Sequence, residues 1–146
     1  MTAKEPQSQH GPKAKFGKQY FVNWDDKKAG GEWYESDITK KPSDPTHTYT
    51  VKSHDGDTKF IKGSRISKAG VKSEEGDTIL AYHKGGRNYA FAGTHVATKG
   101  NKIYVRYDDG DTNWEDSTNV HKLVTLYSLV FDLSGKFHGS IDINIA

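Results

Sequence analysis

Two short acidic turns in this chain place aspartates next to aromatic residues. The turns read His-Asp-Gly-Asp at 54–57 and Asp-Asp-Gly-Asp at 108–111. Glycine accepts a positive φ angle without a Cβ clash, so each stretch predicts a tight turn between two strands. Rings that converge with a carboxylate attract a methylated ammonium group by cation–π contact, about 0.5–2 kcal/mol per ring. The same rings could instead stack on sugar faces, with the aspartates accepting hydrogen bonds from hydroxyl groups.

The chain offers few residues for catalysis or for metal binding. Its seven histidines show no spacing that would gather a metal ion, and it has no Gly-x-Ser-x-Gly elbow and no phosphate-binding Gly-x-x-x-x-Gly-Lys loop. The acidic turns lack the bidentate glutamate that a calcium loop requires. Without cysteine there is no thiolate nucleophile and no thiolate metal site. We therefore expect a binding protein with no enzymatic activity, cofactor or metal.

The two turns belong to an internal repeat. Asp55 and Asp109 lie 54 positions apart, and the same offset relates Tyr49 to Ile103 and continues through both hairpins. A constant offset through a whole hairpin indicates duplication of one unit. A β unit of roughly 50 residues is marginal alone, because small domains bury a smaller fraction of their surface. We expect the two units to pack together.

Period-two alternation predicts strands, as where Ile103, Val105 and Tyr107 alternate with Tyr104, Arg106 and Asp108. The 15 glycines suit a turn-rich protein, and the fold class is predicted to be all-β. The expected parts of the chain are a flexible N-terminal tail at 1–17, a first repeat at 18–68, a second repeat at 76–123 and a C-terminal β-hairpin at 124–146.

Both ends of the chain have a distinct expected character. The tail is polar, and it could alternatively be a basic arm that touches an acidic partner through Lys4, Lys13, Lys15 and Lys18. The C-terminal hairpin is the most apolar segment and is expected to be covered, because an exposed apolar edge promotes aggregation. It would pack on the second repeat or on another chain, which makes an oligomer possible.

Longer motifs in both repeats resemble a known family. A strand ending in Trp24, then Gly-Gly-Glu-Trp-Tyr-Glu-Ser-Asp-Ile and later Asp-Gly-Asp, resembles the Tudor and agenet group of the Tudor-like superfamily. The second copy, with Ile-Leu-Ala-Tyr-His, Gly-Gly-Arg-Asn-Tyr-Ala-Phe and Val-Arg-Tyr-Asp-Asp-Gly-Asp-Thr-Asn-Trp-Glu-Asp, is similar. The resemblance covers about residues 19–123. It implies two tandem, strongly bent five-stranded barrels of SH3-like type that bind methylated lysine or arginine in proteins.

Carried over by position, the resemblance implies a ligand-binding site in each repeat. The implied residues are Trp24, Tyr34 and Asp55 in the first repeat, and His83, Phe91, Tyr107 and Asp109 in the second, with Asp111 where the family often has a ring. The ring that precedes the acidic turn in the family is Ser53 in the first repeat. The sequence therefore favours the second repeat as the one that binds a ring-seeking ligand.

Three classes of partner stay open. The first is a methylated histone-like or other protein tail, and the second is a glycan, in which case the protein would be a lectin. The third is a nucleic acid, which an adaptor protein would contact through scattered Lys and Arg side chains. The net charge of +2, from 21 basic and 19 acidic residues, is too balanced to predict nucleic-acid binding by itself. The chain shows no signal peptide and no apolar run long enough to cross a membrane. We expect an intracellular protein, in the nucleus or cytoplasm, with no membrane partner.

Overall fold

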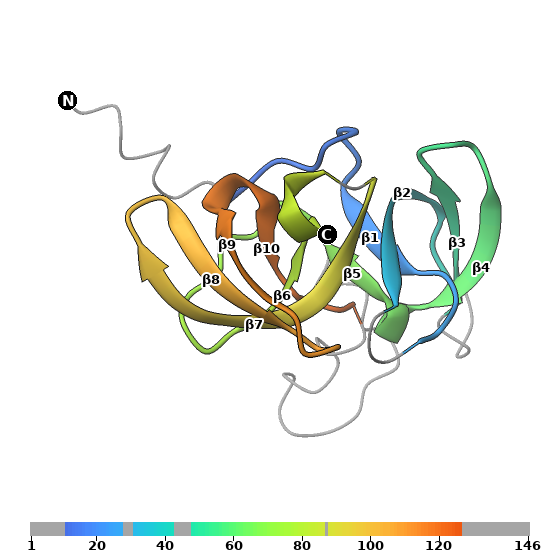
Figure 1. The fold of residues 1–146 in the computed structure, drawn as a ribbon. Helices are drawn as coiled ribbons and strands as arrows, with labels where there is room; N and C mark the ends of the chain where they lie inside the picture. The colour runs from blue at the N-terminus through green and yellow to red at the C-terminus, as the bar shows by residue number, and fades with distance from the viewer. Residues whose placement is uncertain (1–10, 28–30, 43–47, 87, 127–146) are drawn as a thin grey trace, which may run out of the picture.

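The computed structural model describes residues 11–27, 31–42, 48–86 and 88–126 of the 146-residue chain (Figure 1). These residues form strands and short 3₁₀ turns and contain no α-helix, so the predicted all-β class is confirmed. None of their helical segments has the length and hydropathy needed to cross a membrane. The strands are β1 (Tyr20–Asn23), β2 (Glu32–Lys40), β3 (Thr48–Ser53), β4 (Thr58–Lys62), β5 (Ile66–Lys68), β6 (Thr78–Ala81), β7 (Tyr89–Lys99), β8 (Lys102–Tyr107), β9 (Thr112–Asp116) and β10 (Val120–Lys122).

All ten strands belong to one antiparallel sheet whose two halves have the same strand order. The first half reads β4-β3-β2-β1-β5 and the second β9-β8-β7-β6-β10, and β2 pairs with β7 between them. The resemblance noted in the sequence implies two small five-stranded barrels, whereas the described strands form one continuous sheet without a closed barrel. The 3₁₀ turns η1 (Gly63–Arg65) and η3 (Ser117–Asn119) redirect the chain, so β5 pairs with β1 and β10 with β6.

The strand register shows which residues of the two halves correspond. Ser36 of β2 pairs with Ser53 of β3, and Gly93 of β7 pairs with Tyr107 of β8. Ser53 and Tyr107 are related by the offset of 54, so Ser36 and Gly93 are counterparts at an offset of 57. The extra residues therefore lie in the loops, where insertions are tolerated.

The two halves meet symmetrically along β2 and β7. Trp33 lies directly opposite Ala90, and Tyr34 lies opposite Tyr89. Trp33 and Ala90 are themselves counterparts at the offset of 57, so the seam is centred on equivalent residues. The halves therefore meet as the subunits of a twofold dimer do.

A separate apolar core lies between the halves. Phe21, its counterpart Leu80 and Tyr82 are fully buried, and Trp33 is buried beside them. The buried imidazole of His121 packs edge-on against Phe21, with ring centroids 4.8 Å apart. Burial of one such side chain stabilises a fold by about 1.5–3 kcal/mol, so this core holds the halves together.

Each half also has its own core of inward-facing strand residues. The first contains Val22, Tyr49, Val51, Ile61, Ile66 and Leu126, and the second contains Ile79, Ala81, Ile103, Val105, Tyr107 and Val120. Leu126 follows the second repeat in the sequence but packs in the first core, where its amide donates to the Ile66 carbonyl at 3.0 Å. The described start of the predicted C-terminal hairpin therefore returns to the first half. The rest of that prediction, 127–146, falls outside the described residues.

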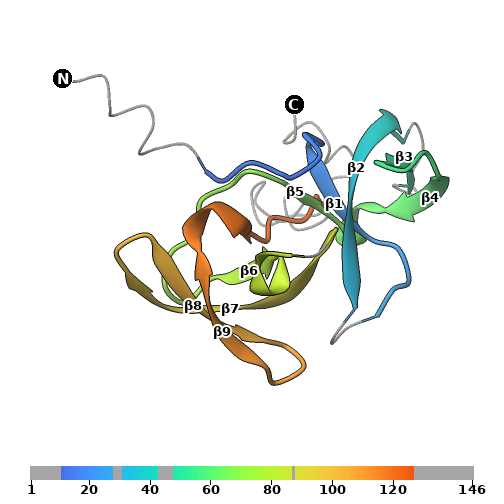
Figure 2. The same cartoon turned by 45° about the horizontal axis from the view of Figure 1, so that its top comes forward.

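Residues 11–19, here called the strap, lie against both halves (Figure 2). The Phe16 amide donates to the carboxyl of Glu35 at 2.8 Å, and the Lys15 amide donates to the Tyr82 hydroxyl at 3.2 Å. Tyr82 in turn donates to the second carboxyl oxygen of Glu35, which is fully buried. A buried carboxyl group requires hydrogen-bond donors, and the strap supplies them. The strap includes residues 11–17 of the tail predicted for 1–17, of which 1–10 fall outside the described residues.

Candidate ligand sites at the acidic turns

The first half has an open cavity of about 230 Å³ beside its acidic turn. The strand end of β1, the middle of β2 and the β3–β4 turn all contribute to it. Its lining residues, here called the first site, are Trp24, Asp25, Tyr34, Ser53, Asp55 and Asp57. The structure therefore brings the sequence-predicted residues Trp24, Tyr34 and Asp55 to one cavity.

The first site is strongly acidic. Asp25, Asp55 and Asp57 are all exposed at its rim. The hydroxyl of Ser53 donates a hydrogen bond to the Asp55 carboxylate, and this bond lowers the pKa of Asp55 below its usual value. Ser53 thus stabilises a negative charge at the position where the resemblance to Tudor-like motifs leads us to expect a ring.

Trp24 forms one wall of the first site. Its ring meets the Tyr34 ring edge-on, with centroids 6.5 Å apart and planes at 90°. The ammonium of Lys59 lies 5.5 Å from the centre of the Trp24 ring and donates to the Trp24 carbonyl at 2.7 Å. The indole Nε1 is buried and has no hydrogen-bond partner in the described structure. One face of the Trp24 ring therefore contacts the Lys59 ammonium, and the indole Nε1 lacks a hydrogen-bond acceptor among the described residues.

Tyr34 forms a second wall, and the second half adds a ring beside it. The Tyr34 hydroxyl donates to Glu32 at 3.2 Å, and burial followed by the Glu32 carboxylate raises the pKa of Tyr34 to about 12. Its phenol is therefore neutral at physiological pH. The Tyr89 ring lies 5.2 Å from the Tyr34 ring because the two residues face each other across the β2–β7 seam.

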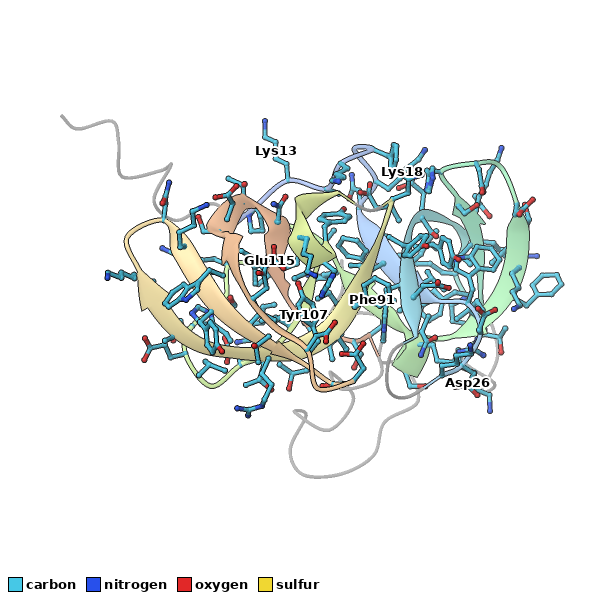
Figure 3. All side chains as sticks on the ribbon, in the orientation of Figure 1. Lys13, Lys18, Asp26, Phe91, Tyr107 and Glu115 are labelled. Atoms are coloured by element: carbon cyan, nitrogen blue, oxygen red, sulfur yellow. The ribbon has the colours of Figure 1, made fainter. Side chains whose placement is uncertain are left out.

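Ring contacts continue from Tyr89 into the second half. Phe91 lies 5.6 Å from Tyr89, His83 lies 6.2 Å from Phe91, and Tyr107 lies 4.6 Å from His83. Figure 3 shows Phe91 and Tyr107 side by side, with Glu115 above them. The aromatic residues predicted for two separate sites therefore form one row that crosses the seam, with Trp24 at one end and Tyr107 at the other.

The second site, defined as His83, Phe91, Tyr107, Asp111 and Glu115, is filled by its own side chains. The buried Tyr107 hydroxyl donates to Glu115 at 2.5 Å, and the Lys84 amide donates to the same oxygen at 2.9 Å. Burial and this hydrogen bond raise the pKa of Tyr107 well above its usual range. His83 Nε2 lies 3.3 Å from a carboxylate oxygen of Asp111, outside hydrogen-bonding geometry.

Asp109 plays a local part in the acidic turn. It is exposed, and its carboxylate accepts the Asp111 amide at 3.0 Å, which supports the turn itself. Gly110 in the same turn has φ of 99°, the left-handed region that glycine adopts without strain. Of the residues predicted for the second repeat, the described contacts therefore join His83, Phe91, Tyr107 and Asp111 at the site, whereas Asp109 shapes the turn.

Sequence reasoning missed Glu115 and Tyr89. Glu115 is 2% exposed, and the offset of 54 aligns it with the core residue Ile61. An acid in one repeat at a position that is apolar in the other could have identified Glu115 from the sequence, because a buried acid requires specific partners. Tyr89 had no such signal, since its role depends on the pairing of β2 with β7.

The described residues contain no group of three or more metal-binding side chains placed to hold an ion. No family model matches the chain, and the search of curated proteins gives no match.

Proposed function

We propose that this protein is a non-enzymatic binding module that takes a methylated lysine or arginine side chain of a protein tail at the first site. The observation that carries the proposal is the open cavity between Trp24 and Tyr34, rimmed by aspartates. A methylated ammonium gains cation–π attraction from the rings and Coulomb attraction from the acids. A histone-like tail has this chemistry, and such a partner fits a nuclear or cytoplasmic location.

The strand order supports a Tudor-like identity for each half. Both halves run from a terminal short strand through the first, second, third and fourth strands, with a 3₁₀ turn before the last. Both also place an acidic glycine turn beside a ring-bearing second strand. We therefore propose two tandem units of SH3-like, Tudor-like type that share one continuous sheet.

The first site suits a cation better than a neutral sugar. The three aspartates of its lining give it a negative charge, which the Lys59 ammonium over a face of Trp24 offsets only in part. A sugar would gain ring stacking and hydrogen bonds but no net Coulomb attraction from three aspartates. The Tyr89 ring next to Tyr34 extends the aromatic wall, which compensates for the ring absent at Ser53.

The first site is also better suited than the second to bind a methylated ammonium group. An entering ammonium at the second site would have to separate His83 from Tyr107 and break the buried bond between Tyr107 and Glu115. Breaking one such bond inside a protein costs about 1–3 kcal/mol when it leaves a polar group unsatisfied. The first site needs no such rearrangement.

The test is a titration with methylated and unmethylated lysine peptides, selected on a histone-peptide array and measured by calorimetry. Tyr34→Ala should weaken binding of the methylated peptide at least about tenfold, since one ring and its cation–π contact are lost. The matched control is Tyr104→Ala on the outer face of β8, where Tyr104 contacts Trp114. That variant should bind as the unchanged protein does.

Three outcomes would overturn the proposal. The first is an array with no signal above the unmethylated peptides. The second is equal loss of binding in the Tyr34 and Tyr104 variants. The third is binding on a glycan array that free sugar competes away and that Tyr34→Ala abolishes, which would assign the same cavity to a carbohydrate.

A further inference from the structure

A basic groove lies on the side of the first half where the strap meets the sheet. Two adjoining cavities of about 530 and 590 Å³ share the residues Gln19 and Tyr20. The first cavity lies between the strap and residues 68–71, and the second follows the end of β2. Together they form what we call the Tyr20 groove.

Lysines dominate the lining of this groove. They are Lys13, Lys18, Lys40, Lys41 and Lys68, and the only acidic residue in the lining is Asp37. Asp37 pairs with Lys18 at 3.3 Å. The other lysines have no carboxylate within ion-pairing distance in the described part of the chain. Four positive charges therefore remain unneutralised around one hollow.

This concentration of charge is not a property of the whole molecule. The net charge is +2, yet the first site carries three aspartates and the Tyr20 groove carries a surplus of lysines. Figure 3 shows Lys13 and Lys18 at the upper edge of the molecule, whereas Asp26, the neighbour of Asp25 in the first site, lies at its lower edge and pairs with Arg65. The segregation creates a local positive potential that the net charge conceals.

We propose that the Tyr20 groove binds the phosphate backbone of a nucleic acid. Lysines spaced along a hollow can follow a chain of phosphates, and each contact releases condensed counterions. Tyr20 is half-buried between the two cavities and, with Gln19, offers a ring and an amide to a sugar or base. An anionic membrane is a flat surface, which suits protruding lysines better than lysines that line a groove.

This inference is independent of the proposed function. The groove and the first site share no lining residue, so one ligand can bind while the other site is empty. With both occupied, the protein would connect a cationic protein tail to a polyanion. Either assignment can fail without affecting the other.

The experiment measures fluorescence anisotropy of labelled duplex DNA and single-stranded RNA, about 20 nucleotides long, between about 50 and 200 mM salt. The test variant is Lys13→Gln/Lys40→Gln/Lys68→Gln. Its charge-matched control is Lys27→Gln/Lys99→Gln/Arg106→Gln, three exposed cations outside the groove that have no ion pair with a described carboxylate. The groove variant should lose at least about tenfold in affinity and two to three units of salt slope, while the control changes less than about twofold.

Several results would overturn the inference. The first is that neither oligonucleotide binds at the lowest salt concentration, or that binding does not weaken as salt is added. Equal weakening in the groove variant and the control variant is another, because it would indicate binding by overall charge. Binding to phosphatidylserine vesicles but to neither oligonucleotide would assign the lysines to a membrane surface instead.

Discussion

The two halves of the molecule have the same strand order, but the space beside the acidic turn is open in one half and filled in the other. Ser53 and Ile61 of the first half correspond to Tyr107 and Glu115 of the second. In the first half a small hydroxyl leaves a cavity open, and an apolar side chain stays in the core. In the second half a tyrosine and a glutamate hydrogen bond with each other and fill the equivalent space. Two positions therefore decide whether a duplicated backbone presents an open site or a closed one.

The seam between the halves shows a second asymmetry. Trp33 and Ala90 are counterparts and face each other, so one large and one small side chain share the centre of the interface. Two tryptophans would not fit in that space, and two alanines would leave it empty. The backbone pairing at the interface is symmetric, and the different sizes of these two side chains allow it to pack.

The largest expected effect is on this seam. Trp33→Ala should lower the free energy of unfolding by about 3–5 kcal/mol, because it leaves a cavity in the core between the halves. Chemical denaturation checks the value. Phe60→Ala is the matched control, since Phe60 is 74% exposed and should lose little stability. If the two substitutions lower the free energy of unfolding equally, the core between the halves does not stabilise the fold more than an exposed side chain does.

The next effect depends on pH and on His121, whose counterpart in the first half is Ser67. Burial lowers the pKa of His121 from 6.5 to about 4. The folded state therefore favours the neutral imidazole. The contribution of neutral His121 to folding stability is fully present above pH 6.5 and is lost as the pH falls toward 4. The loss from this group is about 3 kcal/mol, measured by denaturation at a series of pH values.

The control for that pH series is His121→Asn. The Gly70 amide donates to His121 Nδ1 at 2.9 Å, and an asparagine oxygen can replace this acceptor without titrating. The variant should lose the part of the pH dependence that lies between pH 6.5 and 4. An unchanged pH profile in this variant would transfer the effect to other groups.

A smaller effect tests what closes the second site. Glu115→Ile copies the first half and leaves the Tyr107 hydroxyl and the Lys84 amide without their acceptor, so we expect a loss of about 2 kcal/mol. Adding Tyr107→Phe should recover about 1 kcal/mol, because one orphaned donor is removed. Strictly additive losses in this double-mutant cycle would mean that the two side chains do not stabilise each other.

The smallest effect concerns the strap. Phe16 stacks on His54 with centroids 4.0 Å apart, but it is 42% exposed. Phe16→Ala should therefore cost less than about 1 kcal/mol, since its backbone bond to Glu35 is kept. Deletion of residues 1–17 removes that bond as well and should cost more. Equal stability of the two variants would show that the strap's backbone contacts are dispensable.

The sequence by itself determined what depends on neighbours along the chain. Period-two alternation and the glycine turns predict the strands and both hairpins, because these are local preferences of the backbone. The offset of 54 also predicts the duplication, and the resemblance to Tudor-like motifs implies that Trp24, Tyr34 and Asp55 share one site. These features needed no knowledge of how the halves pack.

Tertiary structure alone decided how the two copies are used. The pairing of β2 with β7, the ring of Tyr89 beside Tyr34 and the return of Leu126 to the first core all join residues far apart in sequence. Such contacts depend on packing between elements, which no local pattern encodes. For the same reason the sequence favoured the second site, where a tyrosine is present, although only the folded chain shows that Glu115 holds this tyrosine and fills the space.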